Sequence, residues 1–311
     1  MKSTDQETKN IAGSTSVKLV TKVKDYVQLI KFTLSFMVVF STVVSFLIAP
    51  NEQFYVRGKL LSVLLLFVAG MLITGSANAI NQVLEKSSDA LMKRTAKRPV
   101  ASGRMSENEA VAFAIIAGAL GVFMMWFFFN FQSAMVSLFS LFLYGFIYTP
   151  LKKVNSISVL IGAIPGALPC LIGWVAATDD FSTGGWVLFA IQFLWQFPHF
   201  WAIAWLAHKD YENAGFKLLP ADKGPTRFTA VQSIIYSALM VPVGLLPYFT
   251  GISGLVSMWI LLACNLFMVY VSVLLFIRMD AKSARRVMFS SYFYLMIVLL
   301  AMFANRANIL N

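Results

Sequence analysis

This sequence is poor in charged residues, and that shortage excludes an ordinary soluble globular protein. Only 13% of its 311 residues are Asp, Glu, Lys or Arg, whereas 59% are hydrophobic. Soluble domains have about 25% charged residues. The chain is therefore predicted to be a polytopic membrane protein whose main partner is the lipid bilayer.

Cysteine and histidine are also scarce. Cys170 and Cys264 lie far apart inside apolar segments, so they are predicted to be buried thiols rather than metal ligands. His199 and His208 are too few for a histidine-rich metal site. The net charge of +11 comes from basic residues scattered in short loops, and this pattern argues against nucleic acid as a partner.

The N-terminal region lacks the features of a cleaved signal peptide. Residues 1–27 are polar, and the apolar run that follows is too long for a signal sequence and has no small-residue cleavage site. We expect residues 1–27 to form a cytoplasmic tail. Residues 28–304 are then one transmembrane domain, and residues 305–311 form a short C-terminal tail.

The long apolar runs predict an all-α membrane protein with nine transmembrane helices. Each run is long enough to cross about 30 Å of hydrocarbon. The third and fourth are separated by a tight turn near Asn130, which predicts a helical hairpin. The nine windows are 28–49, 60–80, 110–128, 133–149, 157–177, 185–207, 228–249, 255–277 and 287–304.

The basic residues predict the orientation in the membrane. If the N-terminus is cytoplasmic, all but three of the 25 Lys and Arg residues fall on the cytoplasmic side, the exceptions being Arg57, Lys59 and Arg306. Cytoplasmic loops of membrane proteins carry such an excess. We therefore predict a multi-pass protein of the cell (cytoplasmic, or inner) membrane, with its C-terminus outside.

The stretch from Asn78 to Ser106 combines acidic and basic residues between two apolar runs. Asn81, Glu85 and Asp89 are spaced four apart, so on a helix they share one face, which Asn78 joins. Mg²⁺ takes one or two protein carboxylates together with phosphate oxygens, and arginine binds phosphate bidentately. The stretch therefore predicts a Mg²⁺–diphosphate site; an ordinary basic loop would explain the cations but not the acidic face. The basic residues are Lys93, Arg94, Lys97 and Arg98.

A second group of polar residues follows the sixth apolar window, on the same predicted side. Asp210 is the candidate second-half carboxylate, with an interfacial charge as the alternative. His199 lies within a span, where an unpaired polar group is costly. It therefore either bonds to a neighbouring helix or contacts a porphyrin. On that side we also expect Tyr148, Thr149, Lys152 and Lys153, as diphosphate-binding residues or as an ordinary basic loop.

The fifth window is rich in glycine and proline. Gly162, Pro165, Gly166, Pro169 and Gly173 lie within it. Such helices kink, and the freed backbone groups are tolerated against protein or a wet cavity. A close-packed helix interface and a cavity wall are both compatible with this composition.

Several motifs together resemble those of the UbiA-type intramembrane prenyltransferases. The run Asn81-x3-Glu85-x3-Asp89 marks the superfamily. Two other runs, Met92-Lys-Arg-Thr-x-x-Arg98-Pro and Trp195-Gln-x-Pro-His199-Phe-Trp, resemble the branch that acts on haem. The remaining matches are Tyr148-Thr-Pro-Leu-Lys-Lys, Gly166-Ala-Leu-Pro-x-Leu-Ile-Gly-Trp174 and Lys209-Asp-Tyr-x-x-Ala-Gly215.

This resemblance implies nine helices around a central cavity and farnesyl transfer from farnesyl diphosphate to a vinyl group of protohaem IX (haem b). Water is added in the reaction, which gives haem O, and the product is handed to a haem O-modifying enzyme or to terminal oxidase assembly. Mg²⁺ is the implied cofactor, and haem is a substrate. The implied catalytic metal ligands are Asn81, Glu85, Asp89 and Asp210. The implied substrate-binding residues are Asn78, Arg94, Lys97, Arg98, Tyr148, Lys153, His199 and Lys209.

The sequence departs from the family pattern at two places. Glu85 stands where the family more often has Asp, and Ala214 follows Asp210 where a second aspartate would complete the motif. Two other functions stay open. One is a prenyltransferase of quinone biosynthesis with an aromatic acceptor, and the other is a secondary transporter, whose site would lie near the bilayer midplane at broken helices.

Overall fold

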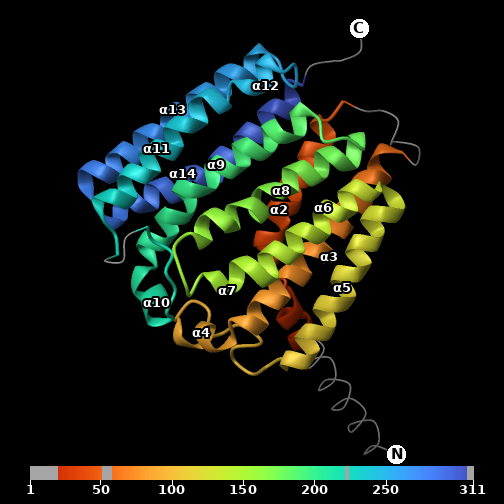
Figure 1. The fold of residues 1–311 in the computed structure, drawn as a ribbon, viewed down its shortest axis with the longest axis vertical. Helices are drawn as coiled ribbons and strands as arrows, with labels where there is room; N and C mark the ends of the chain where they lie inside the picture. The colour runs from red at the N-terminus through yellow and green to blue at the C-terminus, as the bar shows by residue number, and fades with distance from the viewer. Residues whose placement is uncertain (1–19, 51–57, 221–223, 307–311) are drawn as a thin grey trace, which may run out of the picture.

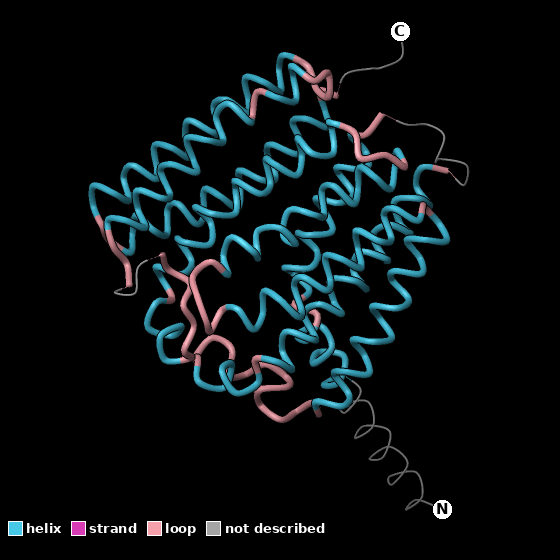
Figure 2. Tube along the Cα trace, in the orientation of Figure 1, coloured by secondary structure: helices cyan, strands magenta, loops and turns pink. Residues whose placement is uncertain are grey.

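The computed structural model describes residues 20–50, 58–220 and 224–306, and within these ranges it is built of helices (Figures 1 and 2). One isolated bridge pairs Ser253 with Arg306. The expectations for residues 1–19 and 307–311, which form most of the two predicted tails, lie outside the described residues.

The described helices confirm the prediction of an all-α multi-pass membrane protein. Eight are long and apolar enough to cross a membrane, and a bent pair of helices, Val20–Leu29 and Phe32–Ile48, brings the number of spans in the described ranges to nine. The elements are α2 (Phe32–Ile48), α3 (Lys59–Leu84), α4 (Lys86–Leu91), α5 (Glu107–Phe128), α6 (Phe131–Phe142), the π-helix η2 (Leu143–Tyr148), α7 (Thr149–Leu151), α8 (Ser158–Thr178), α9 (Thr183–Leu206), α10 (His208–Asn213), α11 (Arg227–Val243), α12 (Leu246–Phe249), α13 (Leu255–Arg278) and α14 (Ala281–Ala304).

The predicted hairpin at Asn130 joins α5 to α6. The Oδ1 atom of Asn130 accepts a hydrogen bond from the Ser133 amide at 2.7 Å, so Asn130 caps the N-terminus of α6. Its Nδ2 atom donates to the carbonyl oxygen of Val175 at 2.8 Å, which ties the turn to α8. The turn is therefore held both locally and from a neighbouring helix.

Helix α8 lies in the middle of the bundle and packs against α2, α6 and α9 (Figure 1). A Cβ atom at Gly173 would overlap the backbone oxygen of Thr42 in α2, so this glycine allows the two helices to approach closely. Pro165, Gly166 and Pro169 line a cavity. Helix α8 therefore forms a close-packed helix interface at Gly173 and a cavity wall at Pro165, Gly166 and Pro169, as the two interpretations of the fifth window proposed.

The first span is broken at Lys31, and α3 satisfies the exposed backbone there. The helices on either side of the break meet at 53°, and Lys31 has left-handed backbone angles (φ 48°, ψ 57°). Asn78 Nδ2 donates to the carbonyl oxygen of Ile30 at 3.1 Å. Gln82 Nε2 lies 3.0 Å from the carbonyl oxygens of both Gln28 and Leu29. Side-chain amides of α3 thus replace part of the interrupted helical hydrogen bonding.

The first helix begins inside the stretch expected to be a tail. Its described part runs from Val20 to Leu29, so residues 20–27 of the expected tail are helical. Asp25, which is 4% exposed, forms an ion pair of 2.8 Å with Arg104 in the loop before α5. The hydropathy pattern missed this helix because charged residues such as Lys22 and Asp25 interrupt it.

Candidate active site

The acidic face predicted around Glu85 exists and is buried. Asn78, Asn81, Glu85 and Asp89 are 2%, 1%, 4% and 0% exposed. Helix α3 ends at Leu84 and α4 begins after Glu85, yet the four-residue hydrogen-bond spacing continues through the junction. The Glu85 amide donates to the Asn81 carbonyl at 3.0 Å, and the Asp89 amide donates to the Glu85 carbonyl at 2.7 Å. The side chains therefore keep a common face although the helix is interrupted.

Each of the three metal ligands predicted on this face has a basic partner. Arg98 Nη1 donates to both carboxylate oxygens of Asp89, at 2.8 and 2.7 Å. Lys152 Nζ lies 2.6 Å from Glu85 Oε1. Lys31 Nζ donates to Asn81 Oδ1 at 2.7 Å. Three cations thus face two carboxylates, so this cluster has an excess positive charge that favours an anionic ligand.

The segment after α6 supplies one wall of the site. The six residues Leu143–Tyr148 form a π-helix, a conformation found frequently at functional sites. The Lys152 ammonium lies 4.6 Å from the centre of the Tyr148 ring. Asn81 Nδ2 donates to the Thr149 hydroxyl at 3.3 Å. The Tyr148–Lys152 motif therefore contacts the acidic face directly.

The segment after α9 supplies another wall. Arg94 Nη2 donates to the Tyr211 hydroxyl at 3.0 Å, and the Lys217 amide donates to the Lys152 carbonyl at 2.7 Å. Met92 packs in a small apolar cluster that includes Phe216. The polar groups after the second and sixth apolar windows are therefore joined at one end of the bundle, where α4, α7 and α10 lie in Figure 1.

The structure distinguishes two neighbouring lysines. We expected Lys153 to bind diphosphate, but its side chain is exposed, whereas Lys152 is 8% exposed and contacts Glu85. Lys97 is likewise exposed, and its backbone oxygen accepts a hydrogen bond from Arg104. The diphosphate-binding roles expected for Lys153 and Lys97 remain predictions.

The second-half residues lie on α10, at the same end of the bundle but away from these contacts. The side chain of Asp210 is partly exposed and that of Lys209 is exposed. Within the described ranges, neither side chain forms a hydrogen bond or ion pair. His208 begins α10, and its Nε2 atom lies 3.7 Å from Glu212 Oε2. The metal and diphosphate roles of Asp210 and Lys209 remain predictions.

Lys31 lies in the site, although the sequence analysis used it only to predict the orientation of the chain in the membrane. A lysine at the start of an apolar run needs a partner, and this general rule was the available signal. The bend that brings its ammonium to Asn81 occurs at Ile30–Lys31, where the sequence has neither glycine nor proline. The position of Lys31 in the site could therefore not be read from local sequence.

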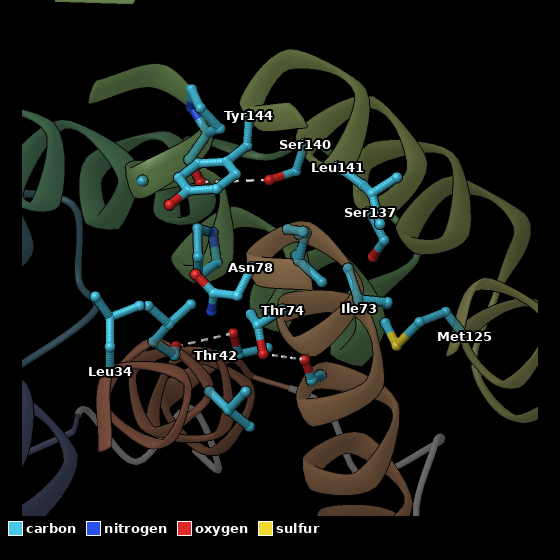
Figure 3. Close-up of a pocket in the computed structure, with 18 of the residues that line it drawn as sticks. Leu34, Thr42, Ile73, Thr74, Asn78, Met125, Ser137, Ser140, Leu141 and Tyr144 are labelled. Carbon is cyan, nitrogen blue, oxygen red and sulfur yellow. Dashed lines mark hydrogen bonds between the residues drawn. The ribbon is translucent and has the colours of Figure 1, made fainter. Parts of the chain in front are cut away.

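A largely apolar cavity extends from the acidic face into the bundle (Figure 3). In α3 its lining runs from Asn78 to Leu66, a length on the order of 18 Å at 1.5 Å per residue. Figure 3 shows Asn78 between Tyr144 on one side and Thr42 on the other, with Met125 of α5 also at the wall. The cavity suits an apolar chain that enters past Asn78, the residue of the acidic face that lines it.

His199 lies on α9, where that helix packs against α14. It is 7% exposed, and its Nδ1 atom lies 2.7 Å from the Ser291 hydroxyl oxygen. The expected alternative of a hydrogen bond to a neighbouring helix is therefore observed, and the porphyrin contact remains a prediction.

The oxygen atoms of the acidic face fit Mg²⁺. Asn78 Oδ1 is buried without a hydrogen-bond donor, and Glu85 Oε1 has the Lys152 ammonium as its partner, so the face keeps unused acceptor capacity. No cluster of three or more His, Cys, Asp or Glu side chains suited to a metal occurs in the described ranges. Mg²⁺ does not require such a cluster, because it is commonly held by one or two carboxylates together with substrate phosphates and water. Asn81, Glu85 and Asp89 therefore provide a suitable set of hard oxygen ligands.

Comparison with known proteins identifies the class. Residues 38–302 match the model of the UbiA prenyltransferase family. The chain therefore belongs to the UbiA prenyltransferase family, and it is a membrane-spanning prenyltransferase.

Within this family, the chain is similar to proteins that share one name. The chain is 42% identical over 276 residues to a protein of Cytophaga hutchinsonii named "Protoheme IX farnesyltransferase", covering 89% of this chain and 95% of that protein. A protein of Flavobacterium johnsoniae with the same name is 41% identical over 87% of this chain and 90% of its own length.

Solved structures support the fold. A structure of digeranylgeranylglyceryl phosphate synthase superposes with a TM-score of 0.73 at 21% identity, over 92% of this chain and 98% of that one. A UbiA homologue from Archaeoglobus fulgidus bound to GPP and Mg²⁺ gives a TM-score of 0.63 at 15% identity, over 89% and 99% of the two chains. The expected arrangement of helices is thus confirmed.

Proposed function

We propose that this protein transfers the farnesyl group of farnesyl diphosphate to a vinyl group of protohaem IX, with addition of water, to give haem O. The strongest support is the similarity over nearly the whole length to relatives named for protoheme IX farnesyl transfer. These relatives do not support the alternatives of an aromatic acceptor in quinone biosynthesis or of a secondary transporter.

The basic residues at the acidic face bind the diphosphate and stabilise its departure. Negative charge grows on the leaving oxygen as the farnesyl C1–O bond breaks, and Lys31, Arg98 and Lys152 already lie at the acidic face. Preorganised charges of this kind stabilise a transition state because they need no reorganisation. Arg94 at the Tyr211 hydroxyl extends the basic surface toward α10.

Asn81, Glu85 and Asp89 are the proposed Mg²⁺ ligands, with Asp210 as the second-half partner. When bound, Mg²⁺ neutralises diphosphate charge and so makes it a better leaving group. Glu85 is long enough to serve where the family more often has Asp. We propose that Lys152 replaces Lys153 as the diphosphate-binding lysine of this segment, because Lys152 contacts Glu85.

The apolar cavity holds the farnesyl chain and excludes water from the allylic cation. The vinyl carbon of haem then forms a bond to farnesyl C1. Water adds to the carbon left electron-deficient and loses a proton, while diphosphate leaves with the electrons of the broken C–O bond. Much of the cavity wall is aliphatic, including Leu66, Ile73 and Ile172, and such a wall limits the access of water to the cation.

The basic loops support a cytoplasmic location for this chemistry at the cell membrane. The site contains the loops after α3, α6 and α9, which carry the excess of Lys and Arg. Farnesyl diphosphate and haem are therefore taken up from the cytoplasmic side, and a protein that modifies haem O, or assembles it into an oxidase, receives the product.

Expression followed by haem analysis tests this function. Membranes containing the protein, supplied with farnesyl diphosphate, Mg²⁺ and haem b, should form a haem heavier by one farnesyl group and one hydroxyl group, as measured by chromatography with mass spectrometry. Asp89→Asn should lower the rate by roughly a hundredfold or more. An unchanged haem pool, with a prenylated aromatic acid instead, would show that the acceptor is wrong.

A further inference from the structure

His199 and Ser291 form a buried pair between α9 and α14 that the reaction described above leaves without a stated purpose. Their residue numbers differ by 92, and the His199 Nδ1 atom lies 2.7 Å from the Ser291 hydroxyl oxygen. Ser291 is 0% exposed. Polar side chains within apolar spans are costly, and they are usually paired and functional.

The hydrogen bonds of Ser291 determine which atom of the pair is the donor. Its hydroxyl oxygen lies 2.6 Å from the carbonyl oxygen of Met288, one turn earlier in α14. A carbonyl oxygen only accepts, so the single hydroxyl proton of Ser291 is directed to Met288. The Ser291 oxygen therefore accepts from His199, and the proton of the imidazole is on Nδ1.

This tautomer leaves the other ring nitrogen free to act as a ligand. A neutral imidazole has one proton, so with Nδ1 protonated the Nε2 atom carries a lone pair. Within the described ranges Nε2 forms no hydrogen bond. Metal-ligating histidines show the same arrangement, because they donate the other ring N–H to a fixed oxygen acceptor.

The surroundings also fix the plane of the ring. Trp195 stacks on His199 at a centroid distance of 4.9 Å and an interplanar angle of 16°. Tyr292 meets the ring edge-on at 4.9 Å and 74°. The Trp195 indole N–H donates to the backbone oxygen of Ser291 at 2.7 Å, so the same residue of α14 holds both rings. The imidazole is therefore oriented before any ligand binds.

A single histidine nitrogen in an apolar setting suits a metal that brings its other ligands with it. The described ranges contain no cluster of His, Cys, Asp or Glu that would complete a protein-only metal site. Iron in a porphyrin already has four ring nitrogens and needs only an axial ligand. We propose that Ser291 is a positioning residue that holds His199 as the Nδ1–H tautomer, so that Nε2 ligates the haem iron of the acceptor. This proposal rests on the proposed function.

The test compares haem with iron-free protoporphyrin IX on the purified full-length protein in detergent. The variants are Ser291→Ala, His199→Ala and, as a matched control, Ser290→Ala, whose side chain has no hydrogen bond in the described ranges. Binding is measured by titration. Ligation is read from the Soret band and from the iron–histidine stretch in resonance Raman spectra.

Ser291→Ala should weaken haem binding by roughly ten- to a hundredfold and lower the iron–histidine frequency, because loss of the acceptor makes the imidazole a weaker donor. It should leave the affinity for iron-free porphyrin and for a farnesyl diphosphate analogue unchanged. His199→Ala should lose the histidine signature, and Ser290→Ala should match wild type.

Equal weakening of haem and iron-free porphyrin in Ser291→Ala would show a packing role and overturn the proposal. A wild-type iron spectrum in His199→Ala would overturn it as well. In both cases haem O formation by the wild-type protein would still uphold the proposed function. Failure of the wild-type protein to bind or convert haem would instead overturn both.

Discussion

Two adjacent lysines offer a sharp test of the site. Lys152 and Lys153 have the same chemistry and are adjacent in the sequence, but within the described ranges Lys152 is the one that contacts Glu85, at 2.6 Å. Replacing Lys152 with methionine keeps most of the side-chain volume and removes the charge. Lys153→Met makes the same chemical change at an exposed position and is the matched control.

The structure sets the expected size of the effect. The side chains of Lys152 and Glu85 are 10% and 5% exposed, so Lys152→Met leaves Glu85 as a buried charge without this partner. Removing one member of such a pair costs about 3 to 5 kcal/mol of unfolding free energy. Adding Glu85→Gln removes the stranded charge, so the double variant should recover most of this loss. Exposed-surface changes such as Lys153→Met lie within about 0.5 kcal/mol.

Stability and chemistry are measured separately. Thermal unfolding in detergent should rank Lys152→Met as the least stable, with the double variant Lys152→Met and Glu85→Gln restored toward wild type. Diphosphate release in a single turnover should fall roughly a hundred- to a thousandfold in Lys152→Met, since a charge that stabilises the transition state is lost. It should change little in Lys153→Met. The reasoning is refuted if Lys153→Met is as damaging as Lys152→Met, or if Glu85→Gln fails to restore stability.

Three further predictions concern the bundle. Gly173→Ala should strongly lower thermal stability, because the added methyl group meets the Thr42 backbone oxygen; wild-type stability would mean that α2 and α8 are not in close contact. Asn130→Ala should cost about 1 to 3 kcal/mol in unfolding measurements through loss of its cap to Ser133 and its bond to Val175, with turnover per folded molecule retained. In a cysteine-free background, Asp180→Cys should react with an impermeant thiol reagent on intact cells and Ser102→Cys should not; the reverse pattern would invert the proposed orientation.

Hydropathy was sufficient to predict eight spans and the Phe32–Ile48 part of the first span, but it missed Val20–Leu29. The windows otherwise match the helices because apolar runs of this length have few alternatives to crossing a bilayer. The hairpin at Asn130 was also predictable, because a capping residue between two apolar runs starts the second helix through hydrogen bonds to nearby residues. The common face of Asn81, Glu85 and Asp89 followed from helical spacing alone.

The partners of these residues depended on long-range contacts. No rule based on composition distinguishes Lys152 from Lys153. The two lysines follow a π-helix, and the three-dimensional structure brings Lys152 to Glu85. Lys31 reaches Asn81 through a bend that no glycine or proline announces. Ser291 lies in a separate apolar run, so its bond to His199 has no local signal.

The break in the first span has a consequence for biosynthesis. Its carbonyl groups at Gln28, Leu29 and Ile30 receive donors from Gln82 and Asn78, which the ribosome adds about fifty residues later, at roughly 5–20 residues per second. Until then these carbonyls lack those donors, and an unsatisfied carbonyl is costly in hydrocarbon. We expect the nascent first helix to stay straight or to remain next to the translocon. It bends only when α3 has entered the membrane and its side-chain amides can donate to these carbonyls. The first two membrane segments therefore mature as a pair, and the bend that brings Lys31 to Asn81 forms during synthesis only after α3 has entered the membrane.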